Sequence, residues 1–250
     1  MNKKSIVAGN WKMNKTHKET EEFIKNIIPE ISSARASVYL AVPFTSLQTA
    51  IDSSSKANII IGAQNMYDEP EGAFTGEISA GMLKALNVEF VLIGHSERRH
   101  IFNEDNALIN KKILRALKTG IQPILCIGET QKEREENRTE KVLEEQFSLG
   151  LKSVSKEDFK NIIIAYEPVW AIGTGKTATT EIAEEAHHFI RKLIIKYFDK
   201  QIAEASYLLY GGSVKPNNVE ELMQQKNIDG VLVGGASLDY KIFAEIINKA

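Results

Sequence analysis

Short and almost continuous runs of apolar residues recur along the chain, and each is followed by a longer segment. The runs are Ser5–Gly9, Val38–Val42, Ile59–Ala63, Phe90–Ile93, Ile121–Ile127, Ile162–Tyr166, Tyr207–Tyr210 and Gly230–Val233. An unbroken apolar run of this length is typical of a parallel strand that is covered on both faces, because a half-buried strand would alternate apolar and polar residues. The pattern therefore predicts eight parallel strands.

The intervening segments carry apolar residues at helical spacing. Four stripes stand out, from Phe23 to Ile31, Leu108 to Leu117, Val142 to Leu151 and Ile182 to Tyr197. Gly120 follows the second stripe as an expected C-cap. The segment around Leu47–Ala50 predicts only a short helix, and the polar run Gln131–Glu140 indicates a solvated loop and helix start.

This alternation predicts an α/β protein of one domain, residues 1–250, folded as a (β/α)8 TIM barrel with eight parallel strands ringed by helices. No stretch rich in Pro, Gly or Ser divides the chain. A doubly wound open sheet is the competing architecture. Eight units without an additional element favour the closed barrel.

Composition narrows the function classes. The chain has 31 basic and 33 acidic residues and a net charge of -2, which gives no reason to expect a nucleic acid or membrane partner. The one cysteine, Cys126, cannot form an intramolecular disulfide and is expected in a buried strand. A chain without disulfides fits the reducing cytoplasm. The apolar runs are too short for a signal peptide or a membrane span, which also favours a cytoplasmic location.

The sharpest chemical signal is a carboxylate at the end of a buried run. Glu167 ends the apolar run Ile162–Tyr166, and Pro168 prevents a smooth continuation into helix. Gly173 and Gly175 follow within a few residues. A rigidly placed carboxylate beside a loop with a stiff start and a flexible end suits a general base under a closing lid. An ordinary strand-to-helix loop would explain the same glycines.

Other polar residues stand directly after the remaining strands, where barrels build their sites. Lys12 supplies a positive charge, and His95 is expected to begin a short helix with Ser96 near its cap. A helix N-terminus disfavours imidazolium, so His95 is expected to be neutral. Glycine pairs after the last two strands can bring backbone N–H groups close to a phosphate. Each residue alone has a structural explanation, and their combination favours cofactor-free acid–base chemistry on a small phosphorylated substrate.

Two tempting motifs do not fit their patterns. Gly175-Lys176-Thr177 resembles the end of a P-loop, but that motif requires glycine where the chain has Trp170. His187 and His188 are adjacent on a predicted helix and cannot share a face. No residue spacing indicates a metal, and no glycine-rich dinucleotide fingerprint follows a strand. We therefore expect neither a metal nor a cofactor.

Five motifs together resemble the triosephosphate isomerase family. They are Asn10-Trp11-Lys12-Met13-Asn14, Gly94-His95-Ser96-Glu97-Arg98-Arg99, Ala165 to Gly175, Tyr210-Gly211-Gly212-Ser213-Val214 and Val233-Gly234-Gly235-Ala236. They occur in the family's order and at its separations. The resemblance implies interconversion of dihydroxyacetone phosphate and D-glyceraldehyde 3-phosphate through an enediol(ate), in glycolysis and gluconeogenesis.

The same resemblance implies roles for individual residues. Glu167 would be the base, His95 would polarise the carbonyl, and Lys12 would stabilise negative charge. Substrate would bind at Asn10, Lys12, Gly173, Ser213, Gly234 and Gly235, while Glu97 and Cys126 would lie behind the reacting groups. The lid would comprise Pro168, Val169, Trp170, Ala171, Ile172, Gly173, Thr174, Gly175 and Lys176. From the residues themselves, Glu129 is interpreted as supporting or structural.

The segment Gln64–Ser79 is long for a connection within a barrel, and such loops are usually functional or disordered. In the family it resembles the arm that docks into a partner subunit. The resemblance therefore implies a homodimer with Phe74, Thr75 and Gly76 at the contact.

Two other functions remain open at this point. An aldolase or synthase barrel would use a lysine Schiff base, for which Lys12 is the only candidate, although it fits better beside a phosphate. A catalytically inactive barrel acting as a scaffold would be expected to lack Glu167, His95 or Lys12. The chain retains all three.

Overall fold

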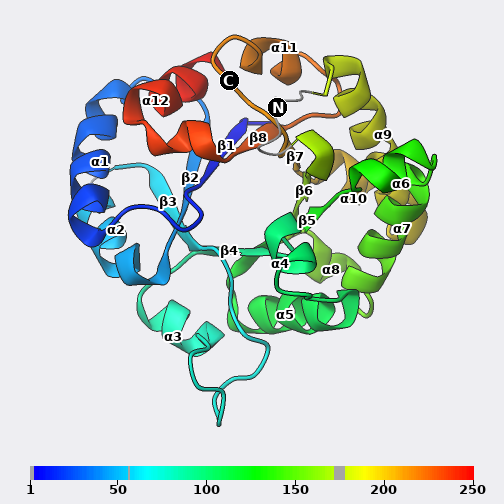
Figure 1. The fold of residues 1–250 in the computed structure, drawn as a ribbon, viewed down its shortest axis with the longest axis horizontal. Coiled ribbons are helices and arrows are strands. Elements are labelled where there is room, and N and C mark those ends of the chain that lie inside the picture. The colour runs from blue at the N-terminus through cyan, green and yellow to red at the C-terminus, as the bar shows by residue number, and fades with distance from the viewer. Residues whose placement is uncertain (1–2, 56, 172–177) are drawn as a thin grey trace.

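A computed structural model describes residues 3–55, 57–171 and 178–250. Its strands are β1 (Ile6–Asn10), β2 (Ser37–Val42), β3 (Ile59–Ala63), β4 (Phe90–Ile93), β5 (Gln122–Ile127), β6 (Ile163–Tyr166), β7 (Leu208–Tyr210) and β8 (Gly230–Val233). They pair in parallel in chain order, and β8 pairs with β1, which closes the barrel (Figure 1). Closure rules out the open sheet, and each predicted strand is confirmed to within one residue at either end.

Helices surround the barrel on all sides (Figure 1). They are α1 (His17–Glu30), α2 (Leu47–Ser54), α3 (Ala80–Ala85), α4 (Ser96–His100), α5 (Asn106–Thr119), α6 (Gln131–Glu135), α7 (Thr139–Gly150), α8 (Lys156–Phe159), α9 (Thr180–Tyr197), α10 (Lys200–Ala205), α11 (Val219–Met223) and α12 (Tyr240–Lys249). Short 3-10 turns are η1 (Phe44–Ser46), η2 (Val169–Ala171) and η3 (Gly235–Leu238). None of these helices combines the length and hydropathy that crossing a membrane requires.

Alternate strand residues supply two separate apolar clusters. Ile6 and Ala8 point into the barrel with Phe90 and Leu92, whereas Val7 joins the layer between strands and helices. Both faces of the sheet are therefore buried, which explains why the runs are continuously apolar in sequence. The interior is packed with side chains below the site, so polar chemistry is confined to the strand ends.

Local signals fix where the helices begin and end. Thr16 and Glu19 form a reciprocal capping box at α1, and Thr130 and Glu133 do the same at α6. Gly120 follows α5 with φ 70, so the expected C-cap is confirmed. The helix expected around Leu47–Ala50 is present and extends to Ser54.

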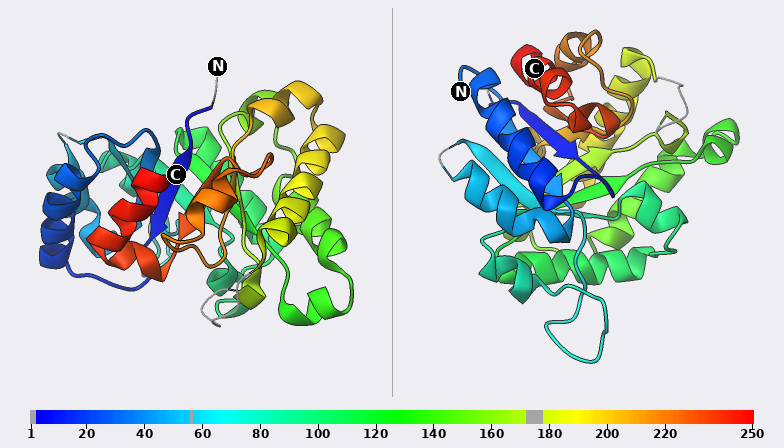
Figure 2. Two further views of the ribbon diagram at one scale, coloured as in Figure 1. Left: turned by 90° about the horizontal axis from the view of Figure 1, so that it is seen from above. Right: turned by 60° about the vertical axis from the view of Figure 1, so that its left-hand side comes forward.

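The segment between β3 and α3 projects away from the barrel (Figures 1 and 2). Its base is closed by the Tyr67 N–H, which donates to the Ile78 carbonyl at 2.8 Å. The Tyr67 and Phe74 rings pack with centres 4.7 Å apart, yet Phe74 remains 40% exposed. The expected long loop is thus an ordered projection with an apolar ring near its end.

Burial of His187 on α9 predicts a dependence of stability on pH. Burial lowers the pKa of His187 to about 3 in the folded state. Above an unfolded pKa of about 6.5, neither state binds this proton. As the pH falls from 6.5 toward 3, only the unfolded state binds it, so stability falls, by about 2 kcal/mol at pH 5. Urea unfolding at pH 8 and pH 5 should show this loss.

The variant His187→Phe keeps a ring but cannot titrate, so its free energy of unfolding should change less between these pH values. His188→Phe removes an exposed imidazole from the same helix and serves as the control. Equal pH dependence in the unaltered protein and His187→Phe would contradict a folded pKa far below the unfolded one.

Candidate active site

A cavity of about 410 Å³ lies at the carboxyl ends of the strands. Asn10, Lys12, His95 and Glu167 line it, together with Ala171, Leu232 and the segments 211–215 and 234–236. These groups follow β1, β4, β6, β7 and β8. Because parallel strands all end at one face of a barrel, residues far apart in sequence converge there.

Glu167 is held by its backbone on both sides. Its N–H donates to the Ile127 carbonyl at 2.8 Å, and the Gly211 N–H donates to the carbonyl of Tyr166 at 2.7 Å. A Cβ at Gly128 would overlap the Glu167 carbonyl oxygen, and one at Gly211 would come within 2.9 Å of its Cγ. Pairing of the sheet thus continues beyond β6, and glycines let neighbouring backbone approach Glu167 closely.

The Glu167 carboxylate is only 2% exposed and faces α4. Its Oε2 accepts a hydrogen bond from the Ser96 N–H at 3.0 Å, and its Oε1 lies 3.2 Å from His95 Nε2. An ionised carboxylate is stabilised by such donors. The carboxylate therefore packs against the first turn of α4, at the edge of the cavity.

His95 is the N-cap of α4, and Ser96 is the first residue of the helix, so the short helix expected at His95 is present. Its Nδ1 accepts a hydrogen bond from the Glu97 N–H at 3.2 Å. A nitrogen that accepts cannot carry a proton, so the ring is neutral with its proton on Nε2. Nε2–H faces the Glu167 carboxylate and the cavity. The expectation of a neutral donor is consistent with this geometry.

Lys12 adopts a left-handed backbone conformation with φ 53, which is unusual for a residue with a side chain. Two side chains hold it there. Its N–H donates to Asn10 Oδ1 at 3.0 Å, and its carbonyl accepts from Gln64 Nε2 at 2.8 Å. The ammonium pairs with Glu97 Oε1 at 2.6 Å. Strain of this kind persists where surrounding contacts fix a functional side chain.

The opposite wall of the cavity is backbone. Gly234 and Gly235 lead into η3, where an added Cβ at Gly235 would meet open space. Ser213 lies on the adjoining wall, and its carbonyl accepts from Asn218 Nδ2 at 3.0 Å. An uncovered backbone next to the Lys12 ammonium suits an anion. The expected contact Gly173 and the lid residues Ile172 to Lys176 lie outside the described residues.

A second group of polar side chains is buried behind the start of the expected lid. Glu129 is fully buried and accepts hydrogen bonds from Tyr166 Oη at 3.1 Å and Trp170 Nε1 at 2.9 Å. The Arg134 guanidinium lies over the Trp170 ring. Burial raises the pKa of Glu129, and these hydrogen bonds oppose the rise. Glu129 thus supports the segment from Pro168 to Ala171 and does not line the cavity.

Cys126 lies inside the barrel on β5, fully buried next to Glu167. Burial first, and the Glu167 charge second, raise the pKa of its thiol well above the ordinary value. A thiol in this environment stays protonated and unreactive. Arg99 spans the ends of β4 and β5 by donating to the Gly94 and Cys126 carbonyls. These residues pack the layer below the carboxylate.

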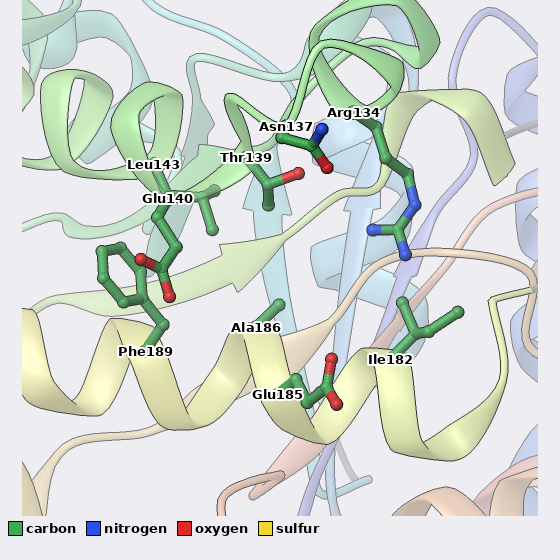
Figure 3. A pocket seen from close by; sticks show the side chains of 9 residues that line it. All are labelled: Arg134, Asn137, Thr139, Glu140, Leu143, Ile182, Glu185, Ala186 and Phe189. Atoms are coloured by element: carbon green, nitrogen blue, oxygen red, sulfur yellow. The ribbon is translucent and has the colours of Figure 1, made fainter.

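Another cavity, of about 430 Å³, lies outside the barrel between the α6–α7 region and α9 (Figure 3). Leu143, Ala186 and Phe189 give it an apolar floor, and Glu140 and Glu185 stand at its rim (Figure 3). Its polar groups do not converge on one point. Within the described ranges, no group of three or more His, Cys, Asp and Glu side chains could hold a metal ion.

Comparison with known proteins identifies the family. A model of the family "Triosephosphate isomerase" matches residues 5–250. The chain belongs to the triosephosphate isomerase family. It is 50% identical to the triosephosphate isomerase of Finegoldia magna over 247 residues, which cover 98% of both chains. It is 50% identical to that of Alkaliphilus metalliredigens over 246 residues, with 98% of this chain and 99% of the relative covered.

Membership of the triosephosphate isomerase family agrees with how the structure places the expected residues. Lys12, His95 and Glu167 meet in one cavity, with Glu97 beside Lys12 and 3.7 Å from His95. Sequence reasoning assigned no role to Gly128, Gly211 or Ser96 in holding Glu167. Side-chain chemistry carries no signal for these three, because they act through backbone atoms or through the absence of a Cβ.

We expect Gly128→Ala to abolish most activity of the site, because its methyl group would displace the Glu167 backbone. Loss of one well-placed catalytic group typically costs at least ~10²-fold in turnover. Gly81→Ala is the matched control, since a Cβ there meets only Ser79 Oγ at 3.7 Å. Steady-state turnover and thermal unfolding should be measured on both. Turnover by Gly128→Ala within twofold of the control would show that the contact does not fix Glu167.

Proposed function

We propose that this protein interconverts dihydroxyacetone phosphate and D-glyceraldehyde 3-phosphate by proton transfer through an enediolate at the cavity of Lys12, His95 and Glu167. Membership of the triosephosphate isomerase family supports this reaction. The observation that carries the assignment of residues is their convergence: a buried carboxylate, a neutral imidazole donor and an ammonium line one cavity of about 410 Å³.

Glu167 acts as the base. It takes a proton from C1 of dihydroxyacetone phosphate, the C–H electron pair forms the C1–C2 double bond, and the π pair of the C2 carbonyl moves onto O2. A proton then passes from the C1 hydroxyl to O2 by way of His95. The electron pair left on O1 forms the aldehyde carbonyl, and C2 takes the proton back from Glu167. Because the carboxylate is hydrogen-bonded to Ser96 N–H, it must leave that donor to reach the substrate. Release from the donor and from water makes the carboxylate a stronger base.

His95 and Lys12 stabilise the charge that develops on the substrate oxygens. His95 Nε2–H donates a hydrogen bond to the carbonyl oxygen and then to the enediolate oxygen. The imidazole is neutral while it donates. Lys12, steadied by Glu97 and by Asn10, supplies the positive charge near both the enediolate and the phosphate. Asn10 orients the substrate oxygens.

The phosphate binds to backbone N–H groups of Ser213, Gly234 and Gly235 and of Gly173. The segment Pro168–Lys176 closes over the intermediate, because an enediolate beside a phosphate eliminates it when water enters. Glu97 and Cys126 act indirectly, Glu97 by holding Lys12 and Cys126 by filling space beneath Glu167. The reaction requires no cofactor or metal.

A homodimer in the cytoplasm is the form that we infer to be active, with residues 1–250 acting as one barrel domain. Phe74 projects from the barrel half-exposed, Met13 is exposed directly after Lys12, and Ile101 and Phe102 are exposed directly after α4. Large apolar side chains exposed near a site are typical of an interface. Docking of Phe74, Thr75 and Gly76 into a second copy would cover them and steady the site.

The two alternatives are less well supported. A Schiff-base enzyme needs an uncharged lysine aimed at the substrate carbonyl, whereas the Lys12 ammonium is paired with Glu97 at 2.6 Å. An inactive scaffold has no need for the strained Lys12 backbone, which costs free energy to maintain.

We expect Glu167→Gln to reduce turnover by at least ~10³-fold while a phosphorylated enediolate mimic still binds, because an amide keeps the shape but cannot take a proton. Glu157→Gln, at an exposed position on α8, is the control. A coupled isomerase assay and calorimetric titration measure the two quantities. Near-normal turnover by Glu167→Gln would remove it from the role of base.

Lys12→Ala should lower turnover by at least ~10²-fold and raise KM, because it removes the cation nearest both the phosphate and the enediolate. Lys18→Ala removes an exposed cation from the neighbouring helix and serves as the control. Equal kinetics in the two variants would place Lys12 outside the reaction.

Thr75→Arg should weaken the dimer and cause specific activity to fall on dilution, because a charge at a packed and desolvated contact is costly. Ser55→Arg places the same charge at an exposed position at the end of α2 and serves as the control. Sedimentation and activity are measured over one dilution series. A dilute Thr75→Arg monomer with full specific activity would show that the site is complete without a partner.

A further inference from the structure

Strand β5 continues further toward the site than its neighbour β4 does. The two strands pair as far as Ile93 and Leu125. The chain of β4 then turns away from the sheet at Gly94, which has φ 75, and enters α4. On the other side of β5, the Glu167 N–H still donates to the Ile127 carbonyl at 2.8 Å. The last residues of β5 therefore have a neighbouring strand on one side only.

Two side chains occupy the place that β4 leaves. Cys126 and Gly128 direct their backbone groups toward the missing strand, because Ile127 between them faces β6. Arg99 donates to the Cys126 carbonyl at 3.1 Å. Gln146, from α7, meets both groups of Gly128. Its Oε1 accepts from the Gly128 N–H at 2.9 Å, and its Nε2 donates to the Gly128 carbonyl at 3.1 Å.

The Gln146 amide takes the role of a strand peptide. A neighbouring strand would offer Gly128 one acceptor and one donor, and this single side-chain amide offers the same pair. Gln146 is buried, and so are both of its hydrogen bonds. Exchange of its oxygen and nitrogen would set like groups face to face, so the amide has one stable orientation. Loss of the amide would leave two backbone groups of Gly128 without these partners, which is costly in a buried place.

Gly128 transmits this constraint to Glu167. A Cβ at Gly128 would lie 1.7 Å from the Glu167 carbonyl oxygen, so the two backbones are in direct contact. The Glu167 N–H is held by Ile127, the residue before Gly128. A shift of the Gly128 peptide would therefore move the backbone from which the Glu167 carboxylate extends. A misplacement of about 1 Å in a reacting group can cost on the order of 10²-fold in rate.

We propose that Gln146 is a positioning residue for the base: its side-chain amide replaces the missing peptide of β4 and, through Gly128, fixes the backbone of Glu167. The inference rests on the proposed function, in which Glu167 takes the proton. Both hydrogen bonds of Gln146 go to Gly128 and not to the segments 211–213 and 234–236, which face the expected phosphate. Loss of the amide should therefore lower kcat and leave KM almost unchanged.

The first test compares two variants that each lose two hydrogen bonds from a side chain to the backbone. Gln146→Met keeps a similar length and volume without the amide. We expect its kcat for dihydroxyacetone phosphate to fall about tenfold while KM stays within twofold. Asn110→Leu is the control, because it removes an amide that donates to the Gly150 and Lys152 carbonyls, away from the site. It should lower thermal stability to a similar extent and leave kcat unchanged.

A second variant grades the effect and does not depend on folding of Gln146→Met. Gln146→Asn keeps the amide on a stem one carbon shorter, so it can reach only one of the two Gly128 groups. Its kcat should lie between those of the unaltered protein and Gln146→Met. Hydrogen exchange of the Gly128 N–H, followed by NMR, should be about tenfold faster in Gln146→Asn than in the unaltered protein. The Ile124 N–H, within the regular part of β5, should exchange at the same rate in both.

Three results would overturn the inference: a kcat of Gln146→Met within twofold of Asn110→Leu, a rise in KM as large as the fall in kcat, or unchanged exchange at Gly128. Each can occur in a protein whose unaltered form has isomerase turnover and whose Glu167→Gln variant has lost it. Such a result leaves the proposed function intact. Absence of turnover in the unaltered protein would instead overturn the proposed function, and with it the role of Gln146.

Discussion

The close approach of backbone at Gly128 to Glu167 is the contact on which the site depends. It lets the ends of β5 and β6 remain paired beyond the regular sheet, so that Glu167 N–H still donates to Ile127. The Glu167 backbone is therefore still held by hydrogen bonds of the sheet. From that position its carboxylate accepts the hydrogen bond of the Ser96 N–H. A base positioned by sheet hydrogen bonds is placed more rigidly than one carried by a loop.

The position of Glu167 places its carboxylate next to the N-terminal turn of α4. The N-terminal turn of α4 supplies N–H donors to two groups at once, Ser96 to Glu167 and Glu97 to His95. The second bond holds the imidazole neutral, and the first holds the carboxylate against α4 at the cavity wall. Lys12 provides an ammonium at the cavity wall, where it is paired with Glu97 of α4. Residues of α4 thus contact Glu167, His95 and Lys12.

The fold could be predicted closely because its signal is local. Most strands are apolar runs ended by a polar residue or glycine, as in the run that leads to Glu167, and barrel closure follows from their number and parallel order. Lys12, His95 and Glu167 were also recognisable, since their chemistry is unusual at strand ends. The sequence did not show that the His95 side chain itself caps α4, because imidazole is a rare capping group and only the Nδ1 contact reveals it.

Other features of the site could not be read from sequence. Gly128 looks like any turn glycine until its distance to Glu167 is known, and the left-handed backbone of Lys12 has no compositional sign. The histidine pair His187-His188 was rejected as a metal site because adjacent helix residues do not share a face. Its sequence did not show that one ring is buried between Tyr166 and Tyr210 while the next is exposed. These properties arise from packing between segments distant in the chain.

We infer that Glu167, the carboxylate at the end of β6, moves a proton between adjacent carbons of a triose phosphate. Turnover of dihydroxyacetone phosphate in D₂O, followed by proton NMR of the trapped product, tests it most directly. Proton abstraction and return through Glu167 predicts glyceraldehyde 3-phosphate that carries solvent deuterium at C2. Product formed at the same rate with no deuterium at C2, at any extent of reaction, would indicate direct hydride transfer and contradict the account.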